Sequence, residues 1–171
     1  MSKIRNNKGQ FTKKYNDFEE KENYYLGFDS NEKTFKISKK DYKKVCIHTW
    51  HINSRGYVKT TIGGHKGKKV FLHRYILQFK NPKIQVDHIN HDKSDNRRKN
   101  LRICTNSQNS MNTKREKRGV YYRKDINKWR AVITVNQKRI NLGHFSNYKN
   151  ARKARKKAEN KYFGEFSYKG N

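Results

Sequence analysis

Four residues between positions 87 and 109 have side chains that suit metal-assisted hydrolysis of a phosphodiester: Asp87, His88, Asn100 and Asn109. Asp87 offers a hard carboxylate oxygen and Asn109 a neutral carbonyl oxygen, and both suit Mg²⁺ or Mn²⁺ rather than zinc. An ion held there, with water and phosphate oxygens as its other ligands, would stabilise charge on the scissile phosphate and on the leaving 3′ oxygen.

His88 directly follows Asp87, so on a strand its ring points to the opposite side and need not bind the metal. An imidazole with an unperturbed pKa of about 6.5 suits a general base that takes a proton from water near neutral pH. We expect Asn100 to tie the loop together through hydrogen bonds from its side chain to the backbone, which would aim His88. Taken singly, each of these residues is more often a surface or capping residue, and only their combination favours catalysis.

The charge of the chain indicates what such a site would act on. The 171 residues include 43 Lys and Arg against 14 Asp and Glu, which gives a formal net charge of +29. Aromatic residues make up 13%, whereas a disordered chain would carry few. Folded units with a basic, aromatic surface are typical of nucleic-acid binding. Charge alone also fits a ribosomal or packaging protein, and a membrane-surface protein less well because no helix is apolar on one face and basic on the other.

The cysteines and the apolar segments exclude other classes. Cys46 and Cys104 are far apart and no Cys-x-x-Cys pair occurs, which argues against a structural zinc site or a disulfide framework. The N-terminus has no apolar targeting segment, and no apolar run is long enough to span a membrane. We therefore expect a cytoplasmic protein with reduced thiols and no membrane partner.

The elements that must position the four residues form a predicted ββα unit. Val86–His88 ends a short strand, a polar loop covers 90–99, and Leu101–Ile103 is a second strand. Thr105 can N-cap a helix that continues through Asn109. The upstream segment is predicted to contain strands at 24–28, 34–37, 50–52, 57–62 and 70–72 and helices at 38–45 and 73–79, the last of which stops before Asn81-Pro82.

The pattern over 86–109 resembles that of an HNH endonuclease, specifically the phage and intron-encoded homing type. The motif is Val86-Asp87-His88-Ile89-Asn90, Asn96, Asn100-Leu101-Arg102, Thr105 and Asn109, with a lead-in of Trp50-His51-Ile52-Asn53, Gly56-Tyr57-Val58 and Leu72-His73-Arg74-Tyr75-Ile76. The resemblance covers about residues 24–112. It implies a ββα-metal core in which Asp87 and Asn109 bind one Mg²⁺ or Mn²⁺, His88 is the base and Asn100 is structural. Asn109 replaces the final His of the motif, and His73 and Asn96 match positions where a structural role is favoured.

The C-terminal segment 118–166 resembles an APETALA/ERF-type DNA-binding domain. The matching residues are Arg118-Gly119-Val120-Tyr121-Tyr122-Arg123, Lys128-Trp129-Arg130-Ala131 and Leu142-Gly143-His144-Phe145, followed by a helix over 147–163 and Tyr162-Phe163-Gly164-Glu165-Phe166. The resemblance implies a three-stranded sheet that enters the major groove, with Arg123, Trp129 and Arg139 at contact positions. Lys128 and Arg130 are expected contacts from their neighbourhood. Strand alternation groups Trp129 with Ala131 and Ile133, which favours a buried position for Trp129 instead.

These patterns predict an α+β protein with a ββα-metal nuclease core and a three-stranded antiparallel sheet packed on one helix. The function predicted is a monomeric, site-specific homing endonuclease that cuts double-stranded DNA, in the host cytoplasm if a phage encodes it. The alternatives are a DNA-binding regulator with a decayed nuclease core and, less favoured, an RNA-binding basic protein. Four segments are predicted: a flexible basic arm (1–23), the nuclease domain with its β-rich lead-in (24–113), a linker (114–118) and the DNA-binding domain (119–171).

Overall fold

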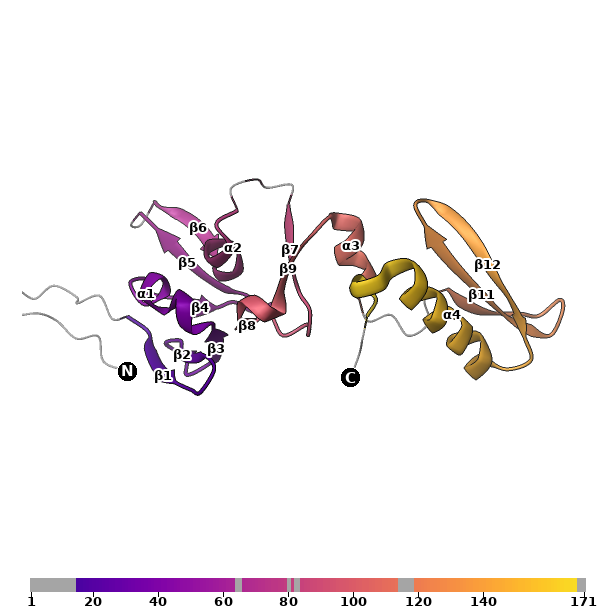
Figure 1. Cartoon of the computed structure of the whole chain (residues 1–171), viewed down its shortest axis with the longest axis horizontal. Coiled ribbons are helices and arrows are strands. Elements are labelled where there is room, and N and C mark those ends of the chain that lie inside the picture. Colours follow the sequence, from indigo (N-terminus) through magenta and orange to yellow (C-terminus); the bar gives the residue numbers. More distant parts are fainter. Residues whose placement is uncertain (1–14, 64–65, 80, 82–83, 114–118, 169–171) are drawn as a thin grey trace, which may run out of the picture. The chain divides into compact units, whose positions relative to one another are not determined.

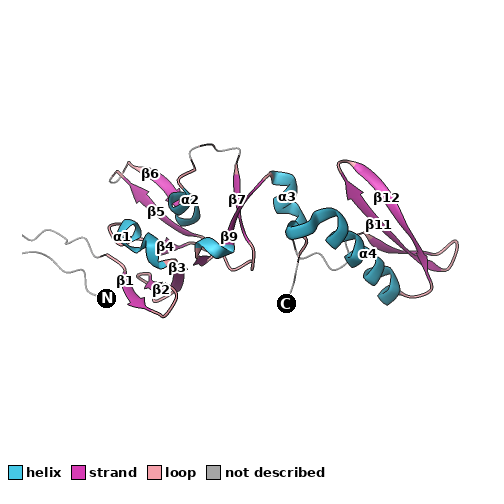
Figure 2. Ribbon diagram, viewed as in Figure 1, coloured by secondary structure: helices cyan, strands magenta, loops and turns pink. Residues whose placement is uncertain are grey.

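The computed structural model describes residues 15–63, 66–79, 81, 84–113 and 119–168 (Figure 1). The described part of the chain divides into two compact units after Ile103. Both units combine helices with strands that are mostly antiparallel, which agrees with the predicted α+β class (Figure 2). The predicted linker 114–118 and Pro82 lie outside the described residues.

The first unit begins with a four-stranded sheet in the order β1-β2-β3-β8. Its strands are β1 (Asp17–Glu20), β2 (Tyr25–Phe28), β3 (Thr34–Ile37) and β8 (Asp95–Asn96). Strand β8 pairs in parallel with β3, with Lys36 opposite Asp95 and Ile37 opposite Asn96. The sequence predicts only a loop at 90–99, because two polar residues give no strand signal until a partner strand is present. This pairing fixes the middle of the loop that follows His88.

Strand β1 corrects the prediction of a flexible arm over 1–23. Residues 1–14 lie outside the described part, but β1 pairs antiparallel with β2 and Phe18 packs against the core of the first unit. Asn16 donates to the carbonyls of Phe28 at 2.8 Å and Trp50 at 2.9 Å, and accepts from the Trp50 amide. Three acidic residues around one Phe hide this strand in the sequence, since only one side chain faces the core.

The rest of the first unit surrounds a core that includes the fully buried Trp50, Phe35 and Leu72. Its elements are the 3₁₀ turn η1 (Lys39–Asp41), α1 (Tyr42–Val45), β4 (His51–Ile52), β5 (Val58–Ile62), β6 (Lys68–Phe71) and α2 (Leu72–Leu77). Strands β4, β5 and β6 form an antiparallel sheet. The predicted hairpin at 53–56 is confirmed: Asn53 Oδ1 accepts from the Arg55 and Tyr57 amides at 3.0 Å each.

The strands of the predicted ββα unit are present, as is its helix. Strand β7 (Gln85–His88) pairs with β9 (Leu101–Cys104), and the 3₁₀ turn η2 (Arg98–Asn100) leads into β9. Helix α3 (Asn106–Met111) starts with a capping box, in which Thr105 and Gln108 satisfy each other's backbone N–H groups. By its packing, α3 belongs to the second unit, whereas the sequence places it in the nuclease domain.

The second unit also contains the predicted three-stranded sheet and its helix. Strands β10 (Val120–Arg123), β11 (Lys128–Val135) and β12 (Lys138–Phe145) pair antiparallel in chain order. Helix α4 (Tyr148–Phe163) is capped by Asn147 and packs against all three strands, with Ala151 and Ala158 buried in the contact (Figure 2). Small alanine side chains allow this close approach.

Arg155 of α4 is buried, unlike the other basic residues of this helix. It is 2% exposed, and it hydrogen-bonds the Val132 carbonyl and Glu159. Gly119, with φ +69°, makes this possible: a Cβ there would lie 2.7 Å from the guanidinium and 2.4 Å from the Val132 oxygen. The long aliphatic stem of Arg155 thus reaches a backbone acceptor that the helical pattern cannot reveal.

Candidate functional site

Asp87 and His88 are consecutive residues of β7, and both are buried in the first unit. Arg102 on β9 donates to Oδ2 of Asp87 from Nε at 2.9 Å and from Nη2 at 2.7 Å. Both side chains of this ion pair are about nine-tenths buried, so the carboxylate is held in one orientation. The sequence analysis did not predict this contact. A signal was present, because Asp87 and Arg102 lie on the two strands that are paired in the predicted ββα unit.

The His88 ring lies among other aromatic rings. His73 of α2 contacts it edge to face, with ring centroids 5.3 Å apart and an interplanar angle of 87°. The centroid of the Tyr57 ring lies 6.1 Å from that of His88 and 5.8 Å from that of His73. Phe71 stacks on His73 with ring centroids 5.5 Å apart. These rings restrict how far the imidazole can rotate, so they fix the direction in which His88 could accept a proton.

Burial lowers the pKa of both histidines because it disfavours the charged imidazolium. For His73, burial together with the neighbouring His88 and Arg74 lowers the pKa to about 3. For His88, burial also lowers the pKa, although Asn96 and the carboxylates of Asp87, Asp92 and Asp95 act in the opposite direction. Both rings are therefore neutral near pH 7, which is the state that a proton acceptor requires.

Asn100 makes the loop-spanning hydrogen bonds that the sequence analysis expects. Its Oδ1 accepts from the Asn90 amide at 3.0 Å, and its Nδ2 donates to the Asp95 carbonyl at 2.8 Å. The Ile89 amide also donates to the Asn100 carbonyl at 2.9 Å. Asn100 therefore joins both ends of the loop directly beyond His88.

Two ion pairs support this loop from the side. Arg97 donates to both carboxylate oxygens of Asp95, from Nε at 2.7 Å and from Nη2 at 2.6 Å. Burial alone would raise the pKa of Asp95, but the hydrogen bonds from Arg97 outweigh it and the pKa lies below its ordinary value. Arg98 holds the buried Asp41 with Nε and Nη2 both at 2.9 Å, which ties η2 to the start of α1.

Asn109, the second predicted metal ligand, lies on α3 in the second unit and is partly buried. Within the described residues, no group of three or more His, Cys, Asp or Glu side chains is arranged to hold a metal ion. The chemistry of the two predicted donors still fits Mg²⁺, because this ion usually takes one or two protein oxygens and completes its shell with water and phosphate. Asp87 also has the fixed carboxylate that such an ion needs.

The outer face of the second unit's sheet carries the other predicted site residues. Arg123 pairs with Lys128, Arg130 with His144, and Arg139 with Thr134, so the strand register places all of these on one face. Arg139 donates to the Tyr121 hydroxyl at 2.6 Å and lies 5.5 Å from the centre of its ring. Arg123 pairs with Asp125 on the surface. Four of the five predicted DNA contacts therefore share one polar surface.

Trp129 is the exception, because the register places it on the opposite face of the sheet. It packs with the buried Val120, Ala131 and Ala151, and its ring lies 4.9 Å from that of Tyr148 on α4. Strand alternation dictates this position, as the grouping with Ala131 and Ile133 in the sequence indicates. We therefore remove Trp129 from the predicted contact residues and assign it to the core of the second unit.

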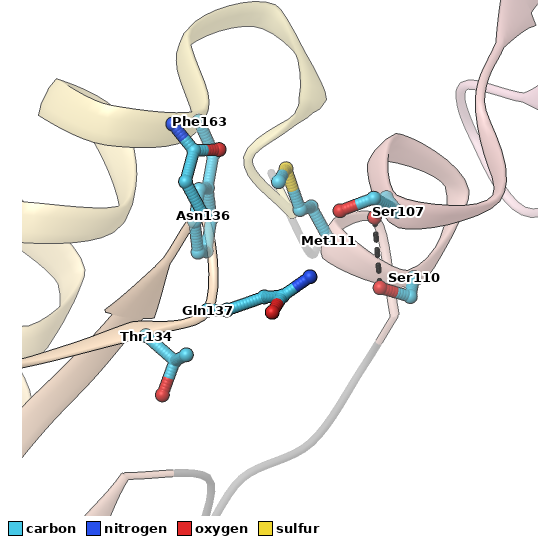
Figure 3. A pocket seen from close by; sticks show the side chains of 7 residues that line it. All are labelled: Ser107, Ser110, Met111, Thr134, Asn136, Gln137 and Phe163. Carbon is cyan, nitrogen blue, oxygen red and sulfur yellow. Dashed lines mark hydrogen bonds between the residues drawn. The ribbon is translucent and has the colours of Figure 1, made fainter.

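Two cavities differ in their chemistry. A cavity of about 460 Å³ in the second unit lies between α3 and the β11–β12 turn, and Gln137 points into it (Figure 3). Its lining residues are Ser107, Ser110, Met111, Thr134, Asn136, Gln137 and Phe163. None of these carries a charge, so the cavity offers nothing to neutralise a phosphate. A groove of about 930 Å³ in the first unit is lined by four cationic side chains.

Comparisons with known proteins give a family match for part of the chain. Residues 70–111 match the HNH endonuclease family, and this range contains Asp87, His88, Asn100 and Asn109. An uncharacterized HNH endonuclease of Acanthamoeba polyphaga mimivirus is 37% identical over 79 residues. The aligned region is 44% of this chain and 42% of that relative, so the match spans less than half of the relative's length.

No solved structure matches the chain. None of the helices in the described residues is long and apolar enough to cross a membrane.

Proposed function

We propose that the protein is a site-specific DNA endonuclease of the homing type, which hydrolyses a phosphodiester with one divalent ion. The observation that carries this proposal is the buried Asp87-His88 pair on β7, held by Asn100 and Arg102, inside the range that matches the HNH endonuclease family. The high positive charge of the chain supports DNA as the substrate, because binding must overcome the repulsion between Asp87 and phosphate.

In this proposal, His88 accepts the proton of the attacking water, and the rings of His73 and Tyr57 hold the imidazole in place. Asn100 is a positioning residue that keeps the loop beyond His88 in register. Asp87 and Asn109 would bind Mg²⁺ or Mn²⁺, which supplies charge stabilisation to the phosphate and the leaving oxygen. The products are 5′-phosphate and 3′-hydroxyl ends.

The second unit supplies affinity and register in this proposal. Its three-stranded sheet is packed on one helix, and this arrangement supports the proposal of a DNA-binding unit. Arg123, Lys128, Arg130 and Arg139 share the face of the sheet opposite α4, which gives them access to a DNA groove. Tandem units on one chain allow a monomer to contact an extended, asymmetric site.

One contact favours a second candidate function, a DNA-binding regulator without nuclease activity. The guanidinium of Arg102 contacts Asp87 and already supplies it with a positive charge, as a metal would. In that case Asp87 has a structural role, and the ββα strands only support the fold.

Plasmid nicking separates the two candidates. The full chain is incubated with a supercoiled plasmid library carrying random inserts, in Mg²⁺, Mn²⁺ or EDTA, beside His88→Ala and the matched control His51→Ala at an exposed position of β4. We expect metal-dependent nicking that His88→Ala abolishes and His51→Ala retains, with equal DNA affinity of the wild type and His88→Ala in EDTA. Binding without nicking in either metal would establish the regulator instead.

A further inference from the structure

A basic groove in the first unit is distinct from the residues assigned so far. It has a volume of about 930 Å³ and is formed by β6, α1 and α2. Its cationic lining residues are Lys44, Lys68, Lys69 and Arg74, and no Asp or Glu lines it. The other lining residues include the aromatic rings of Phe71 and Tyr75. Cations in a groove attract the phosphates of nucleic acid, and apolar rings beside them can pack against the sugars.

The two inner cations are held in place without losing their charge. Arg74 donates to the carbonyls of Ile84 and Asn81 at 2.7 Å each. Lys44 donates to the Ile76 carbonyl at 3.1 Å and lies 5.2 Å from the centre of the Tyr75 ring. Neutral oxygens and a ring orient a cation but leave its net charge for another partner.

The two outer cations, Lys68 and Lys69, are exposed on β6, an edge strand of its sheet. Among the described residues, neither forms an ion pair with a carboxylate. Asp41 is the carboxylate that acts electrostatically on Lys44, and Arg98 already binds it. The groove therefore holds an excess of positive charge that nothing within the described part of this unit neutralises.

A chain of packed rings connects the groove to His88. Phe71 lines the groove with 38% of its surface exposed, and its ring contacts both Tyr57 and His73. His73 in turn contacts the His88 ring. The rings of Phe71 and His73 therefore lie between a polyanion bound in the groove and His88, the proposed base.

We infer that this groove binds the phosphate backbone of double-stranded DNA on one side of the cleavage site, and so directs a strand towards His88. The inference rests on the proposed function, because it takes DNA as the substrate. Lys68 and Lys69 contact phosphates directly, Arg74 and Lys44 provide fixed positive charge behind them, and Phe71 contacts the sugars. These contacts carry no base specificity and add affinity and position only.

The salt dependence of binding tests the groove without any cleavage. The double variant Lys68→Gln/Lys69→Gln is compared with the wild type for binding of a random-sequence DNA duplex in EDTA at several salt concentrations. Loss of two phosphate contacts should make the slope of log K against log salt shallower by about 1.8 and lower the affinity at low salt about tenfold. The control Lys39→Gln/Lys40→Gln removes the same charge from exposed lysines of η1 outside the groove and should change the slope little.

An unchanged slope in the groove variant would overturn the inference, as would an equal effect in the control. A loss of affinity for duplex RNA alone, with DNA binding unchanged, would assign the groove to RNA and likewise overturn it. The nicking assay keeps the two proposals separate. If the wild type does not nick but the slope changes, the groove stands and the nuclease proposal fails. If nicking and slope are both unaffected in the variant, the nuclease proposal stands and the groove fails.

Discussion

The two units differ in how far their polar side chains are buried. In the first unit, the buried polar residues include Asp41, His73, Asp87, His88, Asp95, Asn96 and Asn100, most of them in or beside the loop that follows β7. In the second unit, the buried polar residues among those described are Asn112, Arg155 and Ser167, whereas Lys128, Arg139 and His144 lie exposed on the sheet.

This difference matches what the two units are proposed to do. A reacting group must be held in one geometry, and burial among packed and hydrogen-bonded neighbours achieves this at the cost of removing charges from water. A surface that contacts DNA needs charges that remain hydrated until phosphates replace the water and counterions. The contrast can be tested by changing matched residues in each unit.

The largest expected effect is on the ion pair between the half-buried Arg98 and the buried Asp41 of the first unit. Asp41→Asn weakens the hydrogen bonds from the Arg98 guanidinium by removing the negative charge of their acceptor, so the free energy of unfolding should fall by about 3 kcal/mol. Asp125→Asn breaks the surface pair with Arg123 and should leave stability unchanged within error. Hydrogen–deuterium exchange on the full chain follows both units in one sample. Equal effects in the two units would contradict the contrast.

Asn100→Ala should affect both stability and catalysis. It leaves the Asn90 amide and the Asp95 carbonyl without their side-chain partner, at a cost of about 2 kcal/mol. The proposed base would lose its alignment, so kcat for nicking should fall about 100-fold. DNA affinity in EDTA should stay unchanged, which a merely unfolded variant would not show. Asn150→Ala, at an exposed position in the first turn of α4, serves as the control and should leave kcat unaltered.

His73 should make the first unit sensitive to acid. Its pKa is about 3 in the folded state against about 6.5 when unfolded, so the unfolded chain binds more protons between these values. Stability is therefore complete above pH 6.5 and is lost as the pH falls, by about 2 kcal/mol between pH 7 and pH 5. His73→Phe should remove this loss. A Trp129→Phe background leaves the buried Trp50 as the fluorescent reporter of urea unfolding. An equal acid loss with and without His73 would refute the assignment.

The smallest expected effect is on the exposed sheet of the second unit. Arg139→Gln removes one proposed phosphate or base contact, which should reduce the salt slope of DNA binding by about 0.9 without altering stability. Lys161→Gln, an exposed residue of α4, is the charge-matched control and should leave the slope unchanged. Fluorescence anisotropy with a labelled duplex measures both. A slope that changes equally in both variants would show a general effect of charge.

Local patterns predicted most of the elements correctly. The hairpin at 53–56, the Thr105 cap and the strands and helix of the second unit follow from turn residues, capping residues and periodicity. The features that these patterns do not reveal each depend on a partner outside their own segment. Strand β1 needs β2, and β8 needs β3. The burial of Arg155 needs Gly119 and the Val132 carbonyl.

By itself, the sequence determined the candidate chemistry. Asp87 and His88 are neighbours in any fold, alternation on a strand separates their side chains, and the net charge of +29 indicates a polyanionic partner. These properties depend on residue type and on spacings of a few residues, so they are local. Alternation also assigned Trp129 to the core side of its sheet, as the structure shows.

Only the tertiary structure decided what surrounds these residues. It brought Arg102 to Asp87, placed the rings of Tyr57 and His73 around His88, and gathered cations from α1, β6 and α2 into one groove. Arg98 and Asp41, which hold the loop, are 57 positions apart. Such contacts depend on the path of the whole chain and on the free energy of burying charges together, which no short stretch of sequence contains.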